Sequence, residues 1–270
     1  MLIDRRTPSK LLTPASGFLQ GYSHTLNPYV GCQFACSYCY VREMPVAKFR
    51  GIEWGTWVDV KEQAAEKFRK ELRTAKKKGP VTIFMSSATD PYQPVEYKEQ
   101  ITRSLIQVMT EEHPDYLFLQ TRSPLVLRDM DLLERLKDRL RISITIETDW
   151  EEMRKVFTPQ APPIAARMRA LRTFFQAGYD VQAAVSPILP SSDQFVEKLS
   201  ACTSRVVLDN FVGDGSGGKR SARLGLLKKY EERDLQKWYA PEAINHVHEQ
   251  FSKHFTDDQL FISQCGFLPG

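Results

Sequence analysis

Short apolar runs alternate along this chain with longer amphipathic segments. The short runs are rich in β-branched and aromatic residues, as strands are, and cover residues 25–31, 81–86, 116–121, 142–146, 181–185 and 205–211. Helical patterns fill the intervals, over residues 60–77, 98–112, 128–139, 163–176, 192–202 and 241–254. Strands that alternate with helices form βα units, so we predict an α/β fold with a parallel sheet. Six such units are too few for a full eight-stranded barrel, and they suit a partial (β/α)6 barrel of the TIM type.

We expect this barrel core to occupy residues 25–212. A short N-terminal extension, residues 1–24, would precede it, and a loop and helical extension, residues 213–270, would follow. The Gly-rich stretch within residues 209–223 is interpreted as a linker. Asp59 is a candidate N-cap for the helix that begins at Val60. In barrels of this kind the functional groups lie at the C-terminal ends of the strands, so the site is expected there.

Charge and hydropathy exclude some classes of function. The net charge of +4 comes from 37 basic and 33 acidic residues, which is too balanced to indicate nucleic-acid binding by electrostatics alone. No apolar run has the length of about 18 residues that a membrane span needs. The first residues lack the apolar stretch of a secretory signal, so we expect a cytoplasmic protein without membrane contact.

Three of the five cysteines, Cys32, Cys36 and Cys39, lie within eight residues. Their spacing, Cys-x3-Cys-x2-Cys, lets one loop wrap three thiolates around a single metal centre, and soft thiolates select zinc, copper(I) or iron–sulfur centres. A [4Fe-4S] cluster normally has four cysteine ligands, so three would leave one iron open to a substrate or cofactor. The alternative is a structural zinc with His24 or a distant cysteine as fourth ligand. The chain has no second Cys-x2-Cys, which favours the cluster modestly.

The cysteine motif resembles that of the radical S-adenosylmethionine (SAM) superfamily, in which Gly-Cys-x3-Cys-x-Tyr-Cys follows the first barrel strand. The chain is similar in particular to the branch related to spore photoproduct lyase, over about residues 27–193. The matching stretches are NPYVGCQFACSYCY (27–40), SSATDPYQPVE (86–96), TRSPLVLRD (121–129) and SPILPSSD (186–193). All of them fall at predicted C-terminal strand ends.

The resemblance implies a radical SAM enzyme with a [4Fe-4S] cluster on Cys32, Cys36 and Cys39. SAM would chelate the open iron, and one electron would cleave it to a 5′-deoxyadenosyl radical that abstracts hydrogen from a substrate. Such an enzyme needs a cellular one-electron reductant of the flavodoxin or ferredoxin type. The alternative is a non-catalytic protein whose CxxxCxxC site holds a structural zinc or iron–sulfur centre.

The resemblance also implies a set of SAM contacts. The end of the second strand would meet the SAM amino group through Ser86, Ser87, Thr89 and Asp90, although Asp90-Pro91 is equally typical of a turn. Arg122, at the end of the third strand, would pair with the SAM carboxylate, unless it forms a surface ion pair. Tyr38 would lie near the adenine. Alternate residues of the fourth strand share one face and would point towards the ribose hydroxyls; they are Ser143, Thr145 and Glu147.

One position argues against the repair reaction of the lyase branch. Ser87 stands where the lyase has a hydrogen-donating cysteine, and a serine O–H bond is much stronger than a thiol S–H bond. We expect Cys202 and Cys265 to be buried structural cysteines rather than substitutes for it. Thymine-dimer repair is therefore not predicted. The substrate, with nucleic acid as one possibility, the hydrogen donor and the oligomeric state stay open.

Overall fold

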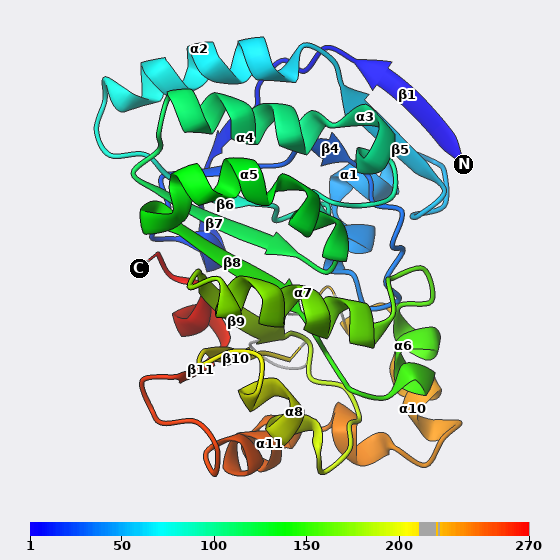
Figure 1. Cartoon of the computed structure of the whole chain (residues 1–270). Helices are drawn as coiled ribbons and strands as arrows, with labels where there is room; N and C mark the ends of the chain where they lie inside the picture. The colour runs from blue at the N-terminus through cyan, green and yellow to red at the C-terminus, as the bar shows by residue number, and fades with distance from the viewer. Residues whose placement is uncertain (211–219, 221, 270) are drawn as a thin grey trace. The chain divides into compact units, whose positions relative to one another are not determined.

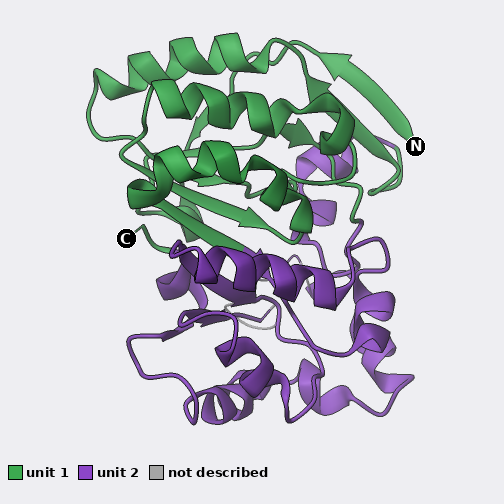
Figure 2. Cartoon of the chain, viewed as in Figure 1, with its two compact units in different colours: residues 1–34, 52–143, 268–270 green, residues 35–51, 144–267 purple. Residues whose placement is uncertain are grey.

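The computed structural model describes residues 1–210, 220 and 222–269, and the chain divides into two compact units (Figure 2). Unit 1 consists of residues 1–34, 52–143 and 268–270, and unit 2 of residues 35–51 and 144–267. Each unit therefore combines segments that are far apart in the sequence. Most of the Gly-rich stretch interpreted as a linker, residues 211–219 and 221, lies outside the described residues.

The central strands of unit 1 are β6 (Thr82–Met85) and β7 (Tyr116–Thr121), which pair in parallel. β3 (His24–Leu26) pairs in parallel with β6, and β2 (Leu12–Pro14) pairs antiparallel with β3. A short 3-10 helix, η1 (Gly17–Leu19), lies between β2 and β3. The predicted strands at 81–86 and 116–121 are confirmed by β6 and β7, whose apolar side chains are almost entirely buried.

A second sheet in unit 1 corrects one sequence prediction. β5 (Trp57–Lys61) pairs in parallel with β1 (Leu2–Arg6) and antiparallel with β4 (Tyr29–Val30). Asp59 and Val60 therefore belong to a strand, and the prediction that a helix starts there with Asp59 as its N-cap was wrong. Helix α2 (Ala64–Lys76) begins after Gln63 instead. Val58 and Val60 are buried in β5, as the β propensity of valine favours.

The helices of unit 1 bury one apolar side each. α2 contributes Phe68 and Leu72, and α4 (Ile101–Glu111) contributes Leu105 and Met109, at helical spacing. α2 contacts α4 and α4 contacts α5 (Met130–Leu133), and Figure 1 shows these helices side by side. Three short segments complete the set: α3 (Glu96–Glu99), η3 (Pro124–Asp129) and η4 (Glu134–Arg139).

β8 (Leu140–Thr145) carries the chain from unit 1 into unit 2. The strands of unit 2 are β9 (Asp180–Val185), β10 (Val206–Leu208) and β11 (Leu260–Ile262), and β10 pairs in parallel with both others. Its other elements are η2 (Tyr40–Glu43), α1 (Pro45–Lys48), α6 (Glu151–Phe157), α7 (Ile164–Gln176), α8 (Phe195–Ser200), α10 (Leu227–Glu231), η5 (Gln236–Tyr239), α11 (Ala243–Phe251) and η6 (Ser263–Phe267).

Both units are built mainly from parallel strands with helices between them, which confirms the predicted α/β class. β11 was not predicted: its strand of three residues is too short to stand out by pattern, and its pairing with β10 defines it. Among the described residues, no helix combines the length and the apolar character that crossing a membrane requires.

Candidate functional site

The first cysteine, Cys32, follows β4 after one intervening residue, Gly31, which has no room for a side chain. Gly31 has a φ of +88°, and a Cβ built on it would lie 2.6 Å from the carbonyl oxygen of Trp57. The chain leaves unit 1 after Phe34, and Ala35 has a φ of 51°. Left-handed backbone conformations therefore lie immediately before the first cysteine, at Gly31, and immediately before the second, at Ala35.

All three cysteine side chains are shielded to some degree. Cys32 and Cys36 are buried, and Cys39 is half-buried. Arg42 supports the second of them, because its guanidinium donates to the carbonyl oxygen of Cys36 at 2.9 Å and to that of Ala35 at 2.7 Å. In the described part of the chain, no three His, Cys, Asp or Glu side chains are arranged as a ready metal site. Metal sites are commonly completed by the metal itself, because binding orders the ligands.

The segment after β6 holds the backbone on both sides of Cys32. Thr89 Oγ1 donates to the carbonyl oxygen of Gly31 at 2.6 Å, and Gln93 Nε2 donates to the same oxygen at 3.2 Å. Gln93 Oε1 accepts from the backbone N–H of Gln33 at 2.8 Å. In return, the Gln33 side chain accepts from the N–H of Val95 at 2.6 Å. The hydroxyl of Thr89, predicted to contact a cofactor, is thus engaged in holding the cysteine loop.

Ser86 and Ser87 differ in how their hydroxyls are used. Ser86 is buried, and its Oγ has no hydrogen-bond partner in the protein. Ser87 Oγ accepts from Asn27 Nδ2 at 3.2 Å, and Asn27 Oδ1 accepts from the N–H of Ala88 at 2.8 Å. A buried polar atom without a partner is rare in folded proteins and indicates a missing ligand or water. Ser86 is thus the member of this pair with unused bonding capacity.

Asp90 joins the ends of two strands. Its carboxylate accepts from the N–H of Tyr92 at 2.9 Å, from Thr121 Oγ1 at 2.7 Å and from the N–H of Arg122 at 2.9 Å. The contact with Tyr92, two residues on, is that of an Asp turn, which the Asp90-Pro91 pair indicated in the sequence. Asp90 and Arg122, both predicted as SAM contacts, are joined through the backbone N–H of Arg122.

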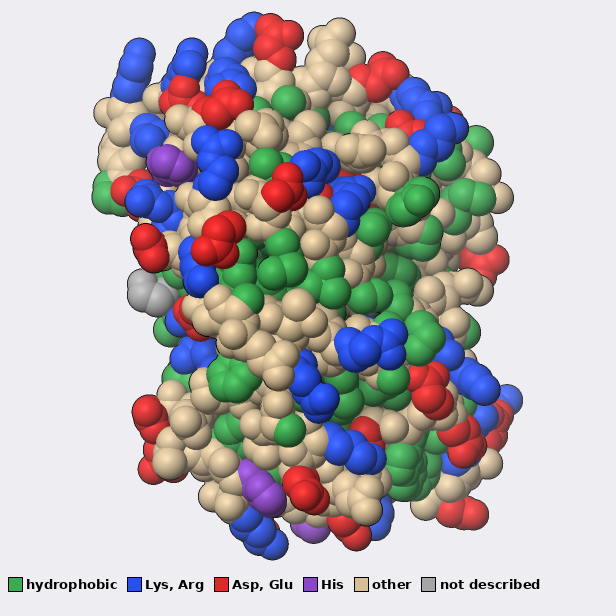
Figure 3. Space-filling view, in the orientation of Figure 1, with side chains coloured by type: hydrophobic (Ala, Val, Ile, Leu, Met, Phe, Trp, Pro, Cys, Tyr) green, Lys and Arg blue, Asp and Glu red, His purple; other side chains and the backbone are tan. Residues whose placement is uncertain are grey.

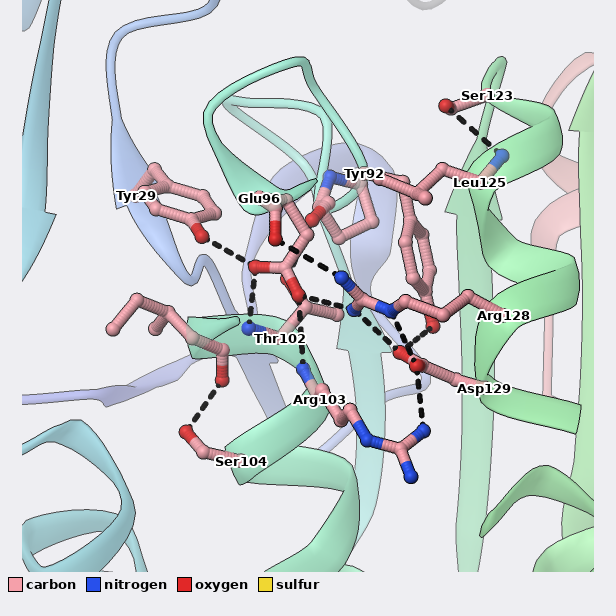
Figure 4. A network of polar contacts seen from close by, with 12 residues as sticks. Tyr29, Tyr92, Glu96, Thr102, Arg103, Ser104, Ser123, Leu125, Arg128 and Asp129 are labelled. Carbon is pink, nitrogen blue, oxygen red and sulfur yellow. Dashed lines mark hydrogen bonds and ion pairs between the residues drawn. The ribbon is translucent and has the colours of Figure 1, made fainter. Parts of the chain in front are cut away.

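Two buried carboxylates, Glu96 and Asp129, lie at the centre of an ion network in unit 1 (Figure 4). Glu96 accepts from Tyr29, from Arg128 Nη2 at 2.6 Å and from the N–H of Arg103 at 3.2 Å. Asp129 accepts from Arg128 Nε at 2.7 Å and from Arg103 Nη1 at 2.8 Å. Burial and the charge of Glu96 raise the pKa of Tyr29 far above its usual range, so Tyr29 donates as a neutral hydroxyl.

In unit 2, the tyrosine between the second and third cysteines is held by a buried ion pair. Tyr38 donates to Glu147 Oε1, and Arg167 Nη1 donates to Glu147 Oε2 at 2.7 Å. Arg167 Nη1 also lies 3.2 Å from the carbonyl oxygen of Thr145. Tyr38 and Glu147 were both predicted as cofactor contacts, and the structure brings them together. Ser143 and Thr145 are buried on β8, as are the other residues of that strand.

Sequence reasoning missed Arg167, although its pattern held a signal. Arg167 lies on the buried side of α7 with Ile164, Leu171 and Phe174, at helical spacing, and is itself fully buried. An arginine in an apolar stripe requires a buried partner, and Glu147 is that partner. Gln93 and Glu96 were quoted within a motif but given no role.

The remaining predicted side chains lie apart from these groups. Cys202 is buried, as expected, whereas Cys265 is exposed, so the prediction of a buried structural role for Cys265 was wrong. Cys265 lies in the short helix η6, which leaves its side chain at the surface. His24, the alternative zinc ligand, contacts Ser23 Oγ through Nδ1 at 2.8 Å. Burial and the nearby Lys10 lower the pKa of His24, so its ring is neutral near pH 7.

A family model described as the radical SAM superfamily matches residues 26–199. A protein of uncharacterised function from Methanocaldococcus jannaschii is 34% identical over 172 residues, which cover 64% of this chain and 62% of that protein. Another, from Acidianus two-tailed virus, is 32% identical over 242 residues, covering 86% of this chain and 77% of that protein. The chain thus spans less than two thirds of the length of the first relative.

Two kinds of solved structure share the fold. Spore photoproduct lyase complexed with dinucleoside spore photoproduct matches with a TM-score of 0.66 and 15% identity, over 96% of this chain and 81% of that one. Streptococcus suis SuiB bound to S-adenosylmethionine matches with a TM-score of 0.56 and 14% identity, over 88% of this chain and 49% of that one. These likenesses confirm the predicted partial-barrel fold.

Proposed function

The chain belongs to the radical SAM superfamily, and we propose that it is an enzyme that uses a [4Fe-4S] cluster and SAM to start radical chemistry on a substrate. The observation that carries the proposal is the cysteine motif within the matched residues 26–199. Its three thiolates lie on one short loop, and two of them are buried. Thiolates are the ligands that iron–sulfur clusters require, so the donor set fits the cluster.

Cys32, Cys36 and Cys39 would hold the cluster and leave one iron for SAM. Bound together, the cluster and SAM would supply a radical able to take a hydrogen atom from a substrate, with the electron for SAM cleavage coming from an external reductant. The protein's own part is to hold both groups and to keep water out. The burial of Cys32 and Cys36 and the contacts around Gly31 serve that purpose.

Ser86 is the best candidate for a direct SAM contact at the end of β6. Its buried, unpartnered Oγ can accept a hydrogen bond from an ammonium group such as that of SAM. Ser87, Thr89 and Asp90 have protein partners, and we propose that they shape the segment beside Ser86. Arg122, at the adjacent strand end, would serve the carboxylate of SAM.

The groups on and after β8 would form the nucleoside side of the SAM site. Glu147 is ion-paired with Arg167 and accepts from Tyr38, so its charge is compensated and its orientation fixed. We propose that Tyr38 lies near the adenine, and that Ser143, Thr145 and Glu147 line the ribose side. The contact between Tyr38 and Glu147 supports this grouping, because it joins the cysteine loop to the end of β8.

The substrate class stays open within the proposal. The fold neighbours differ in what their titles name, a dinucleoside spore photoproduct for the lyase and a precursor peptide for SuiB. On the face shown in Figure 3, acidic and basic side chains of the described residues are intermingled rather than gathered into a basic area. This face gives no electrostatic reason to favour nucleic acid over a peptide or a small molecule. A one-electron reductant of the flavodoxin or ferredoxin type would complete the system.

Anaerobic reconstitution with iron and sulfide tests this function. The protein is expected to turn brown and, once reduced, to release 5′-deoxyadenosine and methionine from SAM. Cys36→Ala is expected to abolish both properties, whereas Cys202→Ala, which removes a buried cysteine outside the motif, is expected to keep them. A colourless protein that binds zinc without sulfide would refute the proposal and support a structural metal site.

A further inference from the structure

We propose that Gln93 is a positioning residue for Cys32, holding the backbone on both sides of that cysteine and keeping the reduction potential of its cluster low. The inference rests on the proposed function, because it concerns the cluster that Cys32 would bind. Gln93 is fully buried and lies on the segment that follows β6, sixty residues from the cysteine loop.

The contacts of Gln93 use both halves of its side-chain amide. Nε2 donates to the carbonyl oxygen of Gly31, before the cysteine, and to Thr89 Oγ1 at 2.9 Å. Oε1 accepts from the N–H of Gln33, after the cysteine. One amide therefore bridges the two peptide groups that flank Cys32. Leucine has a similar size but can make none of these bonds, and glutamate can only accept when ionised.

The surroundings leave this backbone little freedom to adjust. Gly31 lies close against β5, because a Cβ at this position would stand 2.6 Å from the Trp57 carbonyl oxygen. Gln33 is also fixed through its own side chain, which accepts from the N–H of Val95. The same segment is anchored by Glu96, which binds Tyr29 three residues before Cys32 and Arg128 on η3 (Figure 4). A buried amide in such a rigid frame sets the geometry of its neighbour rather than following it.

The bond from Gln33 has an electronic consequence. Hydrogen bonds donated to the sulfur atoms of an iron–sulfur cluster raise its reduction potential. The Gln33 N–H follows Cys32 directly, and Gln93 Oε1 takes its hydrogen bond. Without that acceptor the N–H is released to donate to sulfur. Gln93 thereby withholds one donor and favours the low potential that a reducing cluster needs.

Two substitutions at position 93 separate the positioning of the backbone from the effect on the reduction potential. Gln93→Leu removes the acceptor for Gln33 and the donor for Gly31. Gln93→Glu keeps the acceptor and loses the donor. Gln107→Leu is the matched control: this glutamine lies on α4 in the same unit, and its side-chain bonds, to Thr110 and Glu111, stay within that helix.

Each protein is reconstituted anaerobically, and its iron and sulfide content is measured. The midpoint potential of its cluster comes from a redox titration followed by electron paramagnetic resonance. The stability of the cluster is measured as the rate at which a chelator removes iron. For Gln93→Leu we expect a positive shift in potential and a roughly tenfold faster loss of iron, as other supporting residues around metal ligands show. For Gln93→Glu we expect faster loss of iron without a positive shift. Gln107→Leu should match the wild type in both.

The outcomes distinguish this inference from the proposed function. If the wild-type protein takes up no cluster, the proposed function fails. If the wild type and Gln107→Leu hold a cluster and Gln93→Leu matches them in potential and rate, the positioning role of Gln93 is overturned. Should Gln93→Leu prove insoluble, Gln93→Glu decides, and a wild-type rate of iron loss in that variant overturns the role.

Discussion

Replacing Glu96 by glutamine probes the buried network that joins Tyr29 to Arg128. The substitution keeps the shape of the side chain and removes its charge. Glu96 accepts four hydrogen bonds, from the Tyr29 hydroxyl, the backbone N–H groups of Thr102 and Arg103, and Arg128. All four partners are hydrogen-bond donors. The NH2 group of a glutamine at this position would also be a donor, and it would face two of them.

The cost can be worked from these contacts. Tyr29 can rotate its hydroxyl to accept, but one backbone N–H beside it then loses its acceptor, which costs about 1–3 kcal/mol when the group is buried. Arg128 exchanges a charged partner for a neutral one, which costs about 1 kcal/mol more. Arg128 keeps Asp129 and is 22% exposed, so the full penalty of an isolated buried charge does not arise. We expect Glu96→Gln to lower the free energy of unfolding by about 3 kcal/mol.

Urea unfolding followed by circular dichroism measures this loss, from the midpoint and slope of the transition. The matched control is Glu66→Gln, because Glu66 forms an exposed pair with Lys70 in the same unit. Surface pairs contribute little, so the control should leave the midpoint unchanged. A loss below about 1 kcal/mol for Glu96→Gln, the range of exposed pairs, would contradict the reasoning and show that the network is not tightly satisfied.

Two further predictions concern the cysteine loop and its support. Gly31→Ala should destabilise the protein by more than the roughly 1–3 kcal/mol that backbone strain alone costs, because the new Cβ would also meet Trp57. Gly51 has a φ of +69° and open space around it, so Gly51→Ala should show the strain alone in the same urea assay. Burial lowers the pKa of Lys61 from 10.5 to about 8, so the unfolded chain binds more protons between these values. The free energy of unfolding, measured with urea, should therefore rise with pH from about 8 to 10, and Lys61→Met should abolish that rise. If the free energy of unfolding rises equally with pH in the wild type and in Lys61→Met, the burial of Lys61 is not its cause.

Much of the site was accessible from sequence because its chemistry is local. The spacing of Cys32, Cys36 and Cys39 needs only one loop, and the runs that became β6 and β7 are set by β-branched and aromatic residues. The Asp90-Pro91 turn is likewise a property of adjacent residues. The local sequence pattern failed where strand pairing decided the structure. Asp59 and Val60 suit the start of a helix by sequence, but their pairing with β1 and β4 places them in a strand.

By itself, the sequence determined the parallel α/β class, the cysteine motif and the superfamily, since each depends on neighbouring residues or on a matched pattern. Only the tertiary structure decided which side chains support the motif. Gln93 reaches the peptide groups around Cys32 from sixty residues away, and Arg167 on α7 reaches Glu147 in the segment after β8. Such contacts depend on how strands pair and helices pack, which no local pattern records. The cysteines were therefore visible in the sequence, and the groups that hold them in place became visible only in the fold.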